Sequence, residues 1–396
     1  MFRIFISKKR LKLRKKENEL APWISSAIDE AKKWKDVDFH IISPHHGING
    51  LHKFSDENIH YYFFNPELIV AGHSPKFLLL VNYLINFYFN RKIIIRIVKN
   101  INPDIVNLHG IENPYYASSI FRLKMYPILI TIQGLVSLHP NVSQNWVSKF
   151  ITRRRIQNEQ RAIKEFSNFG IRVRFLEKYI RNINPGSVFF WFKYPFGEGL
   201  KSTQSVEKTY DCVFFSKVVK EKGIEDLIDA LFIVKKELPT ITLKVIGNCS
   251  QGYKNYLADK IKRSDLNNNI EFVGFLPNHE ALNNVVSHAR VSILPTYNDI
   301  LPGTIIESLK LGIPVIAYAA NGVVDFNEKI ETINLIEVGN ISELAKSILN
   351  LLADKSLQED MILRGLEFAS QNCDNSKEFA KMLDSYTKVI QNHKND

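Results

Sequence analysis

The chain has 396 residues, of which 45% are hydrophobic, and its 52 Lys and Arg against 41 Asp and Glu give a formal net charge of +11. This length and apolar content predict two or three folded domains and exclude a disordered or collagen-like protein. The three cysteines form no CxxC pair, which excludes a disulfide framework and a cysteine-based zinc site and is typical of a reducing compartment.

In the first half of the chain, short β-branched runs alternate with helical patterns. The expected strands are 2–6, 37–43, 59–64, 104–108, 128–132, 170–175 and 187–192, and the main helices are 23–34, 77–99 and 146–168. Residues 77–89 are the most hydrophobic stretch, too short to span a membrane, so we expect a buried helix there. An amphipathic surface resting on a membrane is the alternative.

The second half repeats the alternation. Its expected strands are 211–215, 242–246, 270–274, 291–294, 314–317 and 333–336, and its helices are 224–237, 254–263, 279–286, 305–311 and 342–352, with only helical patterns after residue 355. Such alternation predicts βαβ units and hence two Rossmann-like, doubly wound parallel-sheet domains of the α/β class, facing a cleft. We expect domains at 1–197 and 198–375, a polar linker near 196–206, and a helix at 376–396 that can pack back on the N-terminal domain.

The charge is unevenly distributed between the halves. Residues 1–200 carry a net +15 and residues 201–396 a net −4, and the excess lies in Arg3 through Lys16 and in Lys149 through Arg181. This surplus suggests attraction to an anionic membrane surface or a phosphate-bearing acceptor, or is ordinary solvated charge. The basic runs lack stacking aromatics, which argues against nucleic acid. A signal-peptide pattern is missing, so the expected location is cytoplasmic, peripheral on the inner membrane face.

Two stretches can carry chemistry. After the strand at 291–294 the chain reads LPTYNDILPGTIIESLKLGIPV, where Asp299 and Glu307 can border one pocket and the amides of Gly303, Thr304 and Ile305 begin a helix. Helix-start amides bind anions, and carboxylates beside them can hold sugar hydroxyls; the plainer interpretation is that Glu307 only caps its helix.

The other stretch follows the strand at 211–215. It reads SKVVKEKGIEDL, with Lys217 and Lys222 before a glycine and a helix. These lysines can neutralise a diphosphate, or can belong to a solvated loop. The chain has neither a GxGxxG dinucleotide fingerprint nor a P-loop, which argues against an NAD enzyme or an ATPase.

Together these stretches resemble the donor-binding domain of retaining glycosyltransferases of family 4, which have the two-domain GT-B fold. The likeness rests on Lys217, Lys222-Gly223, the strand ending Val-Ile-Gly247, the stretch Val-Gly-Phe275-Leu276-Pro, and Asp299 with Glu307 ahead of Gly-Ile-Pro-Val. Lys217 stands where the family usually has Arg, and Asp299 where it has Glu. In the first half, His109 after a strand resembles the family's cleft histidine, and Gln133 stands where a second His often occurs.

The resemblance implies transfer of a sugar from a nucleotide-diphosphate sugar to an acceptor hydroxyl, with retention, without metal or other cofactor, and in surface polysaccharide, lipopolysaccharide or capsule synthesis. It implies that Glu307 holds the ribose, Asp299 contacts the donor sugar, His109 contacts the sugar or the acceptor, and Phe275 and Leu276 line the base pocket. A glycan or lipid-linked glycan would be the acceptor. The alternatives are another GT-B enzyme, such as a nucleotide-sugar epimerase or hydrolase, and a non-catalytic nucleotide-sugar-binding module.

Overall fold

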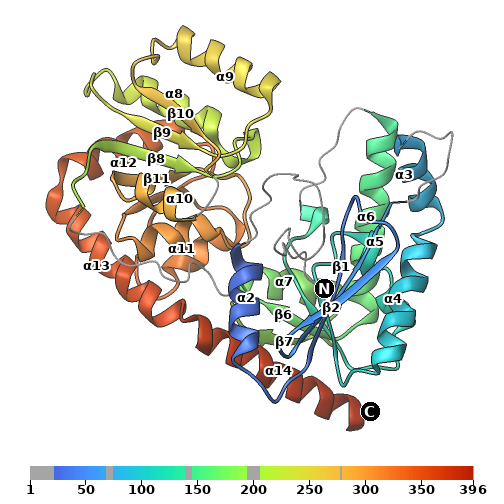
Figure 1. Ribbon diagram of the computed structural model, residues 1–396. Helices are drawn as coiled ribbons and strands as arrows, with labels where there is room; N and C mark the ends of the chain where they lie inside the picture. Colours follow the sequence, from blue (N-terminus) through green and yellow to red (C-terminus); the bar gives the residue numbers. More distant parts are fainter. Residues whose placement is uncertain (1–21, 68–74, 139–144, 194–205, 277–278, 396) are drawn as a thin grey trace. The chain divides into compact units, whose positions relative to one another are not determined.

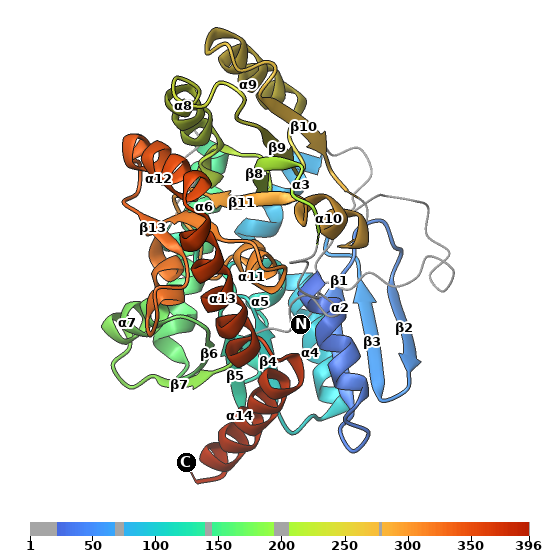
Figure 2. The same cartoon turned by 90° about the vertical axis from the view of Figure 1, so that its left-hand side faces the viewer.

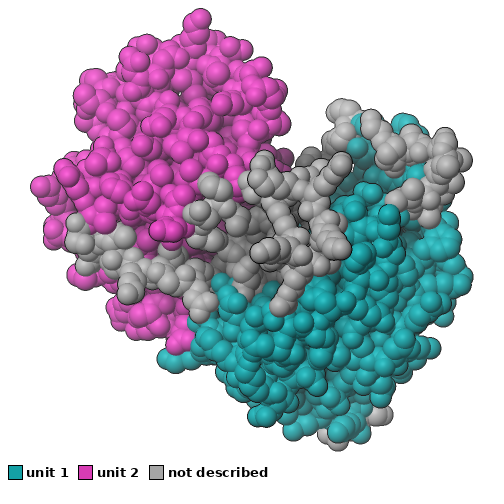
Figure 3. All heavy atoms as spheres, viewed as in Figure 1, with its two compact units in different colours: residues 1–195, 375–396 teal, residues 196–374 magenta. Residues whose placement is uncertain are grey.

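The computed structural model describes residues 22–67, 75–138, 145–193, 206–276 and 279–395. It divides into two compact units, unit 1 being Met1–Pro195 with Asn375–Asp396 and unit 2 being Phe196–Asp374 (Figure 3). The expected strand at 2–6, the basic run from Arg3 to Lys16 and nearly all of the expected linker lie outside the described residues. None of the described helices is long and apolar enough to cross a membrane.

The larger sheet of unit 1 has four parallel strands in chain order. They are β4 (Val106–His109), β5 (Ile128–Thr131), β6 (Asn168–Ile171) and β7 (Val188–Trp191). Leu129, Ile130 and Phe169 of the inner strands β5 and β6 are fully buried, whereas the edge strand β7 exposes Val188 and Trp191. The helices and 3-10 turns among and before these strands are α3 (Pro75–Leu84), α4 (Tyr88–Ile101), α5 (Pro114–Ala117), η1 (Ile120–Arg122), η2 (Val136–Leu138), α6 (Trp146–Glu165) and α7 (Arg174–Ile183).

A three-stranded sheet completes the described part of unit 1. Its strands are β1 (Phe39–Pro44), β2 (Leu51–Asp56) and β3 (Ile59–Phe64), with β3 in the middle, parallel to β1 and antiparallel to β2. Helices α2 (Pro22–Lys32) and α14 (Asn375–Asn395) pack beside each other, as Figures 1 and 2 both show. Phe379, Met382 and Val389 of α14 are buried in the same core cluster as Phe63 of β3. The end of the chain is therefore part of the core of unit 1.

The described residues of unit 2 form a single sheet of six parallel strands in the order β10-β9-β8-β11-β12-β13. The strands are β8 (Tyr210–Phe215), β9 (Leu243–Ile246), β10 (Ile270–Gly274), β11 (Ala289–Leu294), β12 (Val315–Tyr318) and β13 (Asn334–Ile336). The helices and turns are η3 (Lys220–Lys222), α8 (Ile224–Val234), α9 (Gln251–Arg263), α10 (His279–Val286), α11 (Gly303–Lys310), η4 (Asn321–Asn327), α12 (Ile341–Ala353) and α13 (Lys355–Asn372). The parallel sheets of both units confirm the expected α/β class.

The strand order of unit 2 determines where a ligand can bind. From β8, the chain first builds outward through β9 to β10, and then returns to place β11 on the other side of β8. This reversal is a topological switch point, and in open α/β sheets the crevice beyond the carboxyl ends of the strands at that point binds ligands. The loops that follow β8 and β11 are therefore the first place to look for a site.

Three details differ from the sequence expectations. The single helix expected over 77–99 is two helices, because Asn86 and Phe87 have left-handed φ values of 48° and 51° and turn the chain between α3 and α4. The strand expected at 170–175 is β6, which ends at Ile171, and the chain enters α7 at Arg174. Strand β2 was not expected; its polar sequence LHKFSD alternates between exposed and half-buried positions, as an edge strand of a hairpin does.

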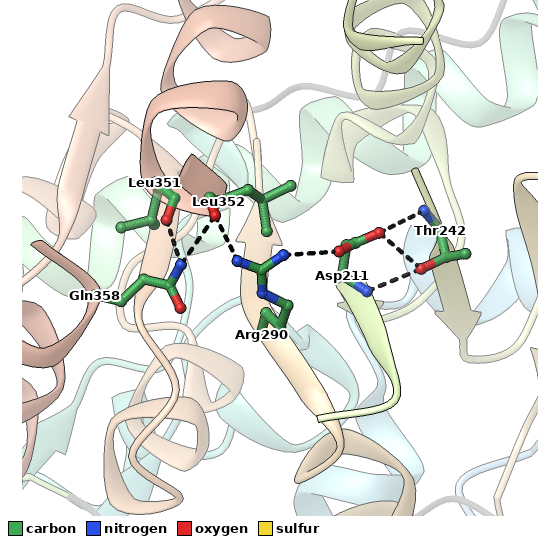
Figure 4. Close-up of polar contacts among 6 residues, drawn as sticks. All are labelled: Asp211, Thr242, Arg290, Leu351, Leu352 and Gln358. Atoms are coloured by element: carbon green, nitrogen blue, oxygen red, sulfur yellow. Dashed lines mark hydrogen bonds and ion pairs between the residues drawn. The ribbon is translucent and has the colours of Figure 1, made fainter. Parts of the chain in front are cut away.

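The amino ends of three strands in unit 2 are joined by a polar network (Figure 4). Arg290 of β11 donates to Asp211 of β8 at 3.1 Å and to the Leu352 carbonyl of α12 at 2.5 Å. Asp211 also accepts from the backbone and hydroxyl of Thr242, just before β9, both at 3.0 Å. Gln358 of α13 donates to the Leu351 carbonyl at 2.6 Å. This network secures the edge of the sheet opposite the switch-point loops.

Candidate functional site

The loops after β8 and β11 are held in close contact at the switch point. Gly223, between η3 and α8, has a φ of 75°, and a Cβ there would lie 1.8 Å from the carbonyl oxygen of Pro295. The Tyr297 amide donates to the Glu221 carbonyl across the same gap at 3.0 Å. Only glycine accommodates both the left-handed conformation and this approach of the two backbones. The Lys-Gly pair singled out in the sequence therefore joins the two loops.

This contact brings together the two stretches that the sequence marked out. Lys222 of η3 forms an ion pair with Asp299 of the β11–α11 loop, although 77 residues separate them. Both side chains are partly buried, with 24% and 18% of their surface exposed. Water screens a pair in this position less than it would on the open surface. The pair places one cation and one carboxylate beside the start of α11.

Glu307 lies on α11 and is only 6% exposed. Burial raises the pKa of its carboxyl to about 7, against a smaller opposing effect of Lys310. No described residue donates a hydrogen bond to this carboxylate. A carboxylate with so little access to water is costly for the fold unless a ligand supplies hydrogen bonds to it. Its chemistry suits acceptance of hydrogen bonds from hydroxyl groups.

The first turn of α11 offers backbone donors. Its N-cap residue is Pro302, which provides no side-chain cap. The amide of Ile305 donates to the Pro302 carbonyl at 3.2 Å, whereas no described group accepts from the amides of Gly303 and Thr304. Two of the three amides that the sequence nominated are thus available, at the positive end of a helix dipole. This is the geometry of an anion site.

The remaining nominated residues of unit 2 lie on neighbouring loops of the same edge. Lys217 follows β8 and lines an open groove of about 570 Å³. The groove is also lined by residues that follow β8 (Val219, Lys220, Glu221) and residues that follow β9 (Asn248, Cys249, Ser250, Tyr253). Phe275 and Leu276 follow β10 and are half-buried, and Leu276 packs against a core cluster that includes Phe215 and Ile246. The nominated residues of unit 2 therefore lie on loops at one end of the sheet or on α11, where Glu307 is in the second turn.

A support for this edge that the sequence did not reveal is Asp226 on α8. Its Oδ2 accepts from the hydroxyls of Tyr297 and Tyr318 at 2.6 and 2.7 Å. Burial, aided by the hydrogen bond to Asp226, raises the pKa of Tyr297 to about 12, so both phenols remain donors at neutral pH. The bonds tie the β11–α11 loop to α8 and β12. An acidic residue in the first turn of a helix gave no signal of this role, because that position is common for helix stability alone.

In unit 1, His109 ends β4 and Gln133 follows β5. His109 is paired with Thr131 in the ladder, is 2% exposed, and burial holds the pKa of its imidazole well below its usual range. Its carbonyl accepts from the Tyr116 hydroxyl at 3.1 Å. Gln133 is half-buried two residues beyond Thr131, at the same sheet edge. The structure therefore brings His109 and Gln133 to adjacent strand ends, with His109 a neutral group.

Next to His109 lies a charged cluster that sequence reasoning missed. Burial raises the pKa of Glu112 to about 7, although Arg155 and Arg172 oppose the shift. Its Oε2 has no partner among the described residues, and both carboxylate oxygens lie 2.6 Å from where a Cβ on Gly110 would be. Arg155 of α6 donates to the Glu112 carbonyl at 2.8 Å. The sequence offered one signal for this cluster: Glu112 is an acidic residue three positions after His109, which ends a strand.

The geometry defines a class of protein: two units built on parallel sheets, of which the sheet of unit 2 has a switch point with free helix-start amides at its edge. Solved structures share this fold. Sucrose-phosphate synthase from Thermosynechococcus elongatus has a TM-score of 0.75 at 15% identity, covering 92% of this chain and 91% of that one. Anabaena HepE in complex with UDP and glucose has a TM-score of 0.68 at 16% identity, covering 94% and 98%. The fold is GT-B.

Sequence comparison gives the family. Residues 198–368 match the family model described as glycosyl transferases group 1, and residues 82–165 match the one described as glycosyl transferase 4-like. The two matches support a group 1 glycosyltransferase of the family 4 type, which confirms the resemblance read from the motifs.

Curated relatives match over part of their length. A 2-deoxystreptamine N-acetyl-D-glucosaminyltransferase of Niallia circulans is 25% identical over 169 residues, 43% of this chain and 42% of the relative. The capsular polysaccharide biosynthesis glycosyltransferase CapM of Staphylococcus aureus is 26% identical over 151 residues, 37% of each protein. The alignments thus span about two fifths of these relatives.

Proposed function

We propose that the protein is a retaining glycosyltransferase that moves a sugar from a nucleotide-diphosphate sugar to an acceptor hydroxyl. The observation that carries the proposal is the Lys222–Asp299 ion pair beside the start of α11, with the buried, donor-free carboxylate of Glu307 on the same helix. The relatives named above are glycosyltransferases, and HepE was solved with UDP and glucose, which supports a nucleotide sugar as donor.

Loss of a nucleoside diphosphate concentrates negative charge on the leaving phosphate. Lys222, Lys217 and the amides of Gly303 and Thr304 supply positive charge and donors for it, so the reaction requires no divalent metal in this proposal. In the free protein, Asp299 neutralises Lys222; an incoming diphosphate would compete for Lys222 and release Asp299 to accept from the donor sugar. The pair thus couples recognition of phosphate to recognition of sugar.

The remaining roles follow from chemical type. Glu307 would accept hydrogen bonds from the ribose hydroxyls, and Phe275 and Leu276 would line the base pocket. His109, held neutral by burial, can donate to or accept from a hydroxyl of the sugar or the acceptor, with Gln133 beside it. None of these steps needs a covalent enzyme nucleophile, which fits the proposed retention through attack on the face that the diphosphate leaves.

We also propose a role in surface polysaccharide, lipopolysaccharide or capsule synthesis, on the inner face of the cytoplasmic membrane. CapM is named for capsular polysaccharide biosynthesis, which supports such a pathway. The +15 of residues 1–200 suits a glycan or lipid-linked acceptor presented at an anionic surface. In this proposal residues 1–197 handle the acceptor and residues 198–375 bind the donor.

The donor site can be tested by two substitutions with matched controls. Lys222→Ala and Glu307→Ala should each lower sugar transfer and the affinity for a nucleotide sugar, read from its thermal stabilisation of the protein, by tenfold or more, since removing one charged hydrogen bond costs about 1.5–3 kcal/mol. Lys329→Ala and Glu331→Ala, at exposed positions of the same unit, should behave as wild type. A panel of nucleotide sugars identifies the donor, because a ligand at 100 times its Kd adds about 2.7 kcal/mol.

If both site variants bind nucleotide sugars and transfer sugar as the wild type does, Lys222 and Glu307 do not form the donor site. Transfer in the presence of excess chelator tests the metal-free mechanism separately, and complete loss of activity there, restored by a divalent ion, would contradict it.

A further inference from the structure

Unit 1 exposes a group of large apolar side chains on α3, α4 and α6. Phe77, Leu79 and Leu84 of α3 and Tyr88 and Phe89 of α4 are 42–60% exposed, and Trp146, the first residue of α6, is 67% exposed. We call these six residues the apolar corner. Leu78, Tyr83 and Phe87 of the same segment are buried, so the hydrophobic stretch contributes to the core and also leaves several large side chains uncovered. An exposed apolar surface of this kind usually marks an interaction site.

The apolar corner is held rigidly. The left-handed turn at Asn86 and Phe87 is anchored by Phe87, which is 2% exposed and lies edge-on to Tyr83 with 4.9 Å between ring centroids. Arg154 of α6 donates to the Tyr83 carbonyl at 3.4 Å, which joins α3 to α6. Figure 1 shows α3 alongside α6, and the two helices are in contact. The exposed side chains therefore belong to a fixed surface rather than to a loose segment.

The charge around the corner has one sign. Residues 75–101 contain five Lys and Arg and residues 146–158 contain four, and neither segment has an acidic residue. Lys92, Lys149 and Arg153 are exposed. The Lys92 ammonium lies 4.6 Å from the centre of the Tyr88 ring, so the cation and the aromatic face form one unit. Aromatic and aliphatic side chains ringed by cations are the composition of surfaces that lie at the headgroup boundary of anionic bilayers.

We propose that the apolar corner docks unit 1 on an anionic membrane, with Phe77, Leu84, Phe89 and Trp146 entering the boundary between headgroups and acyl chains and the flanking Lys and Arg meeting lipid phosphates. This inference deepens the proposed function, on which it rests for its purpose: it names the surface by which the enzyme reaches a membrane-borne acceptor. A second copy is a poorer occupant, because a symmetric contact would set the exposed cations Lys92, Lys149 and Arg153 against the same cations of the other copy.

The test measures partition of the full chain onto vesicles of phosphatidylcholine with phosphatidylglycerol, and onto pure phosphatidylcholine. The wild type should prefer the anionic vesicles. The pair Phe77→Ser with Phe89→Ser, which keeps every charge in the chain, should lower partition about tenfold. The matched control is Phe232→Ser with Leu363→Ser, at unit 2 positions that are 45% and 63% exposed, and it should partition as wild type.

The cationic part is tested separately. Lys149→Gln with Arg153→Gln should lower partition about 25-fold, from roughly fivefold for each basic residue at the surface. The control, Lys329→Gln with Lys346→Gln at exposed positions of unit 2, should leave it unchanged. Tryptophan fluorescence should shift to the blue on adding anionic vesicles, and Trp146→Phe should abolish the shift.

The proposal is wrong if the double variant Phe77→Ser with Phe89→Ser partitions onto anionic vesicles as the wild type does. It is also wrong if the wild type binds neutral and anionic vesicles equally. An oligomer that becomes monomeric in that pair, without vesicle binding by the wild type, would show instead that the corner joins two copies. Thermal stabilisation by nucleotide sugars is measured on the same proteins and should not change in the corner variants. If no nucleotide sugar stabilises the wild type, the proposed function is wrong. The vesicle result would still decide whether the apolar corner binds membranes.

Discussion

Replacing Glu307 by Gln should stabilise the protein while weakening donor binding, and the gain should depend on pH. The carboxyl ionises near pH 4.5 in an unfolded chain, whereas burial raises its pKa in the folded state to about 7. Between these values the unfolded chain releases a proton that the folded protein keeps, so folding becomes less favourable as pH rises through this window. At about 1.4 kcal/mol per pKa unit, the full penalty above pH 7 is about 3 kcal/mol.

Glutamine has nearly the same shape and no charge, so Glu307→Gln should remove that penalty. The expected gain in the free energy of unfolding is about 1 kcal/mol near pH 5.5 and about 3 kcal/mol near pH 8.5. Denaturant unfolding of wild type and variant at both pH values measures it, with Glu331→Gln at an exposed position as the control. A gain that is the same at both pH values, or a variant less stable than wild type at pH 8.5, would refute the reasoning.

Three further outcomes are expected. Gly223→Ala should abolish donor binding and lower stability, because its Cβ would lie 1.8 Å from the Pro295 carbonyl oxygen and its φ of 75° disfavours any L side chain; nucleotide-sugar thermal shifts measure both effects. Arg290→Met should lower the free energy of unfolding by about 1–3 kcal/mol, since it leaves the Asp211 carboxylate with one partner fewer, yet donor affinity should stay unchanged because the network lies at the opposite sheet edge. Glu112→Gln should stabilise unit 1 more at pH 8.5 than at pH 5.5, since burial raises the pKa of that carboxyl to about 7; equal unfolding curves at the two pH values would contradict it.

The alternation of strands and helices was readable because most described strands are short, largely buried runs. Val291–Leu294 and Ile128–Thr131 consist largely of β-branched or aliphatic residues, and parallel strands covered on both faces need such runs. Strand β2 was missed for the converse reason: Leu51–Asp56 is an antiparallel edge whose side chains are half in water. The break between α3 and α4 was missed because neither Asn86 nor Phe87 is a glycine or proline, the usual signals of a turn.

The candidate site divides in the same way. The residues of the donor-side motifs could be named from the sequence, because helix starts after strands and Lys-Gly pairs have recognisable local patterns. Their pairing could not: the contact between Lys222 and Asp299 depends on the approach of two loops 77 residues apart. The environments that raise the carboxyl pKa of Glu307 and Glu112 could not be predicted from the sequence either, since burial is a property of packing rather than of local sequence.

Helix α14 has a consequence for how the protein is made. Unit 2, residues 196–374, is contiguous in the chain, whereas unit 1 takes its first part from residues before 196 and its last helix from residues after 374. On the ribosome, unit 2 can therefore close while the core of unit 1 still lacks Phe379, Met382 and Val389. During that interval the surfaces that will receive α14, including Phe39, whose ring meets Phe379 at 5.9 Å, are open to water and to chaperones. The order of synthesis thus allows unit 2 to mature first, while unit 1 can complete its core only when α14 has emerged.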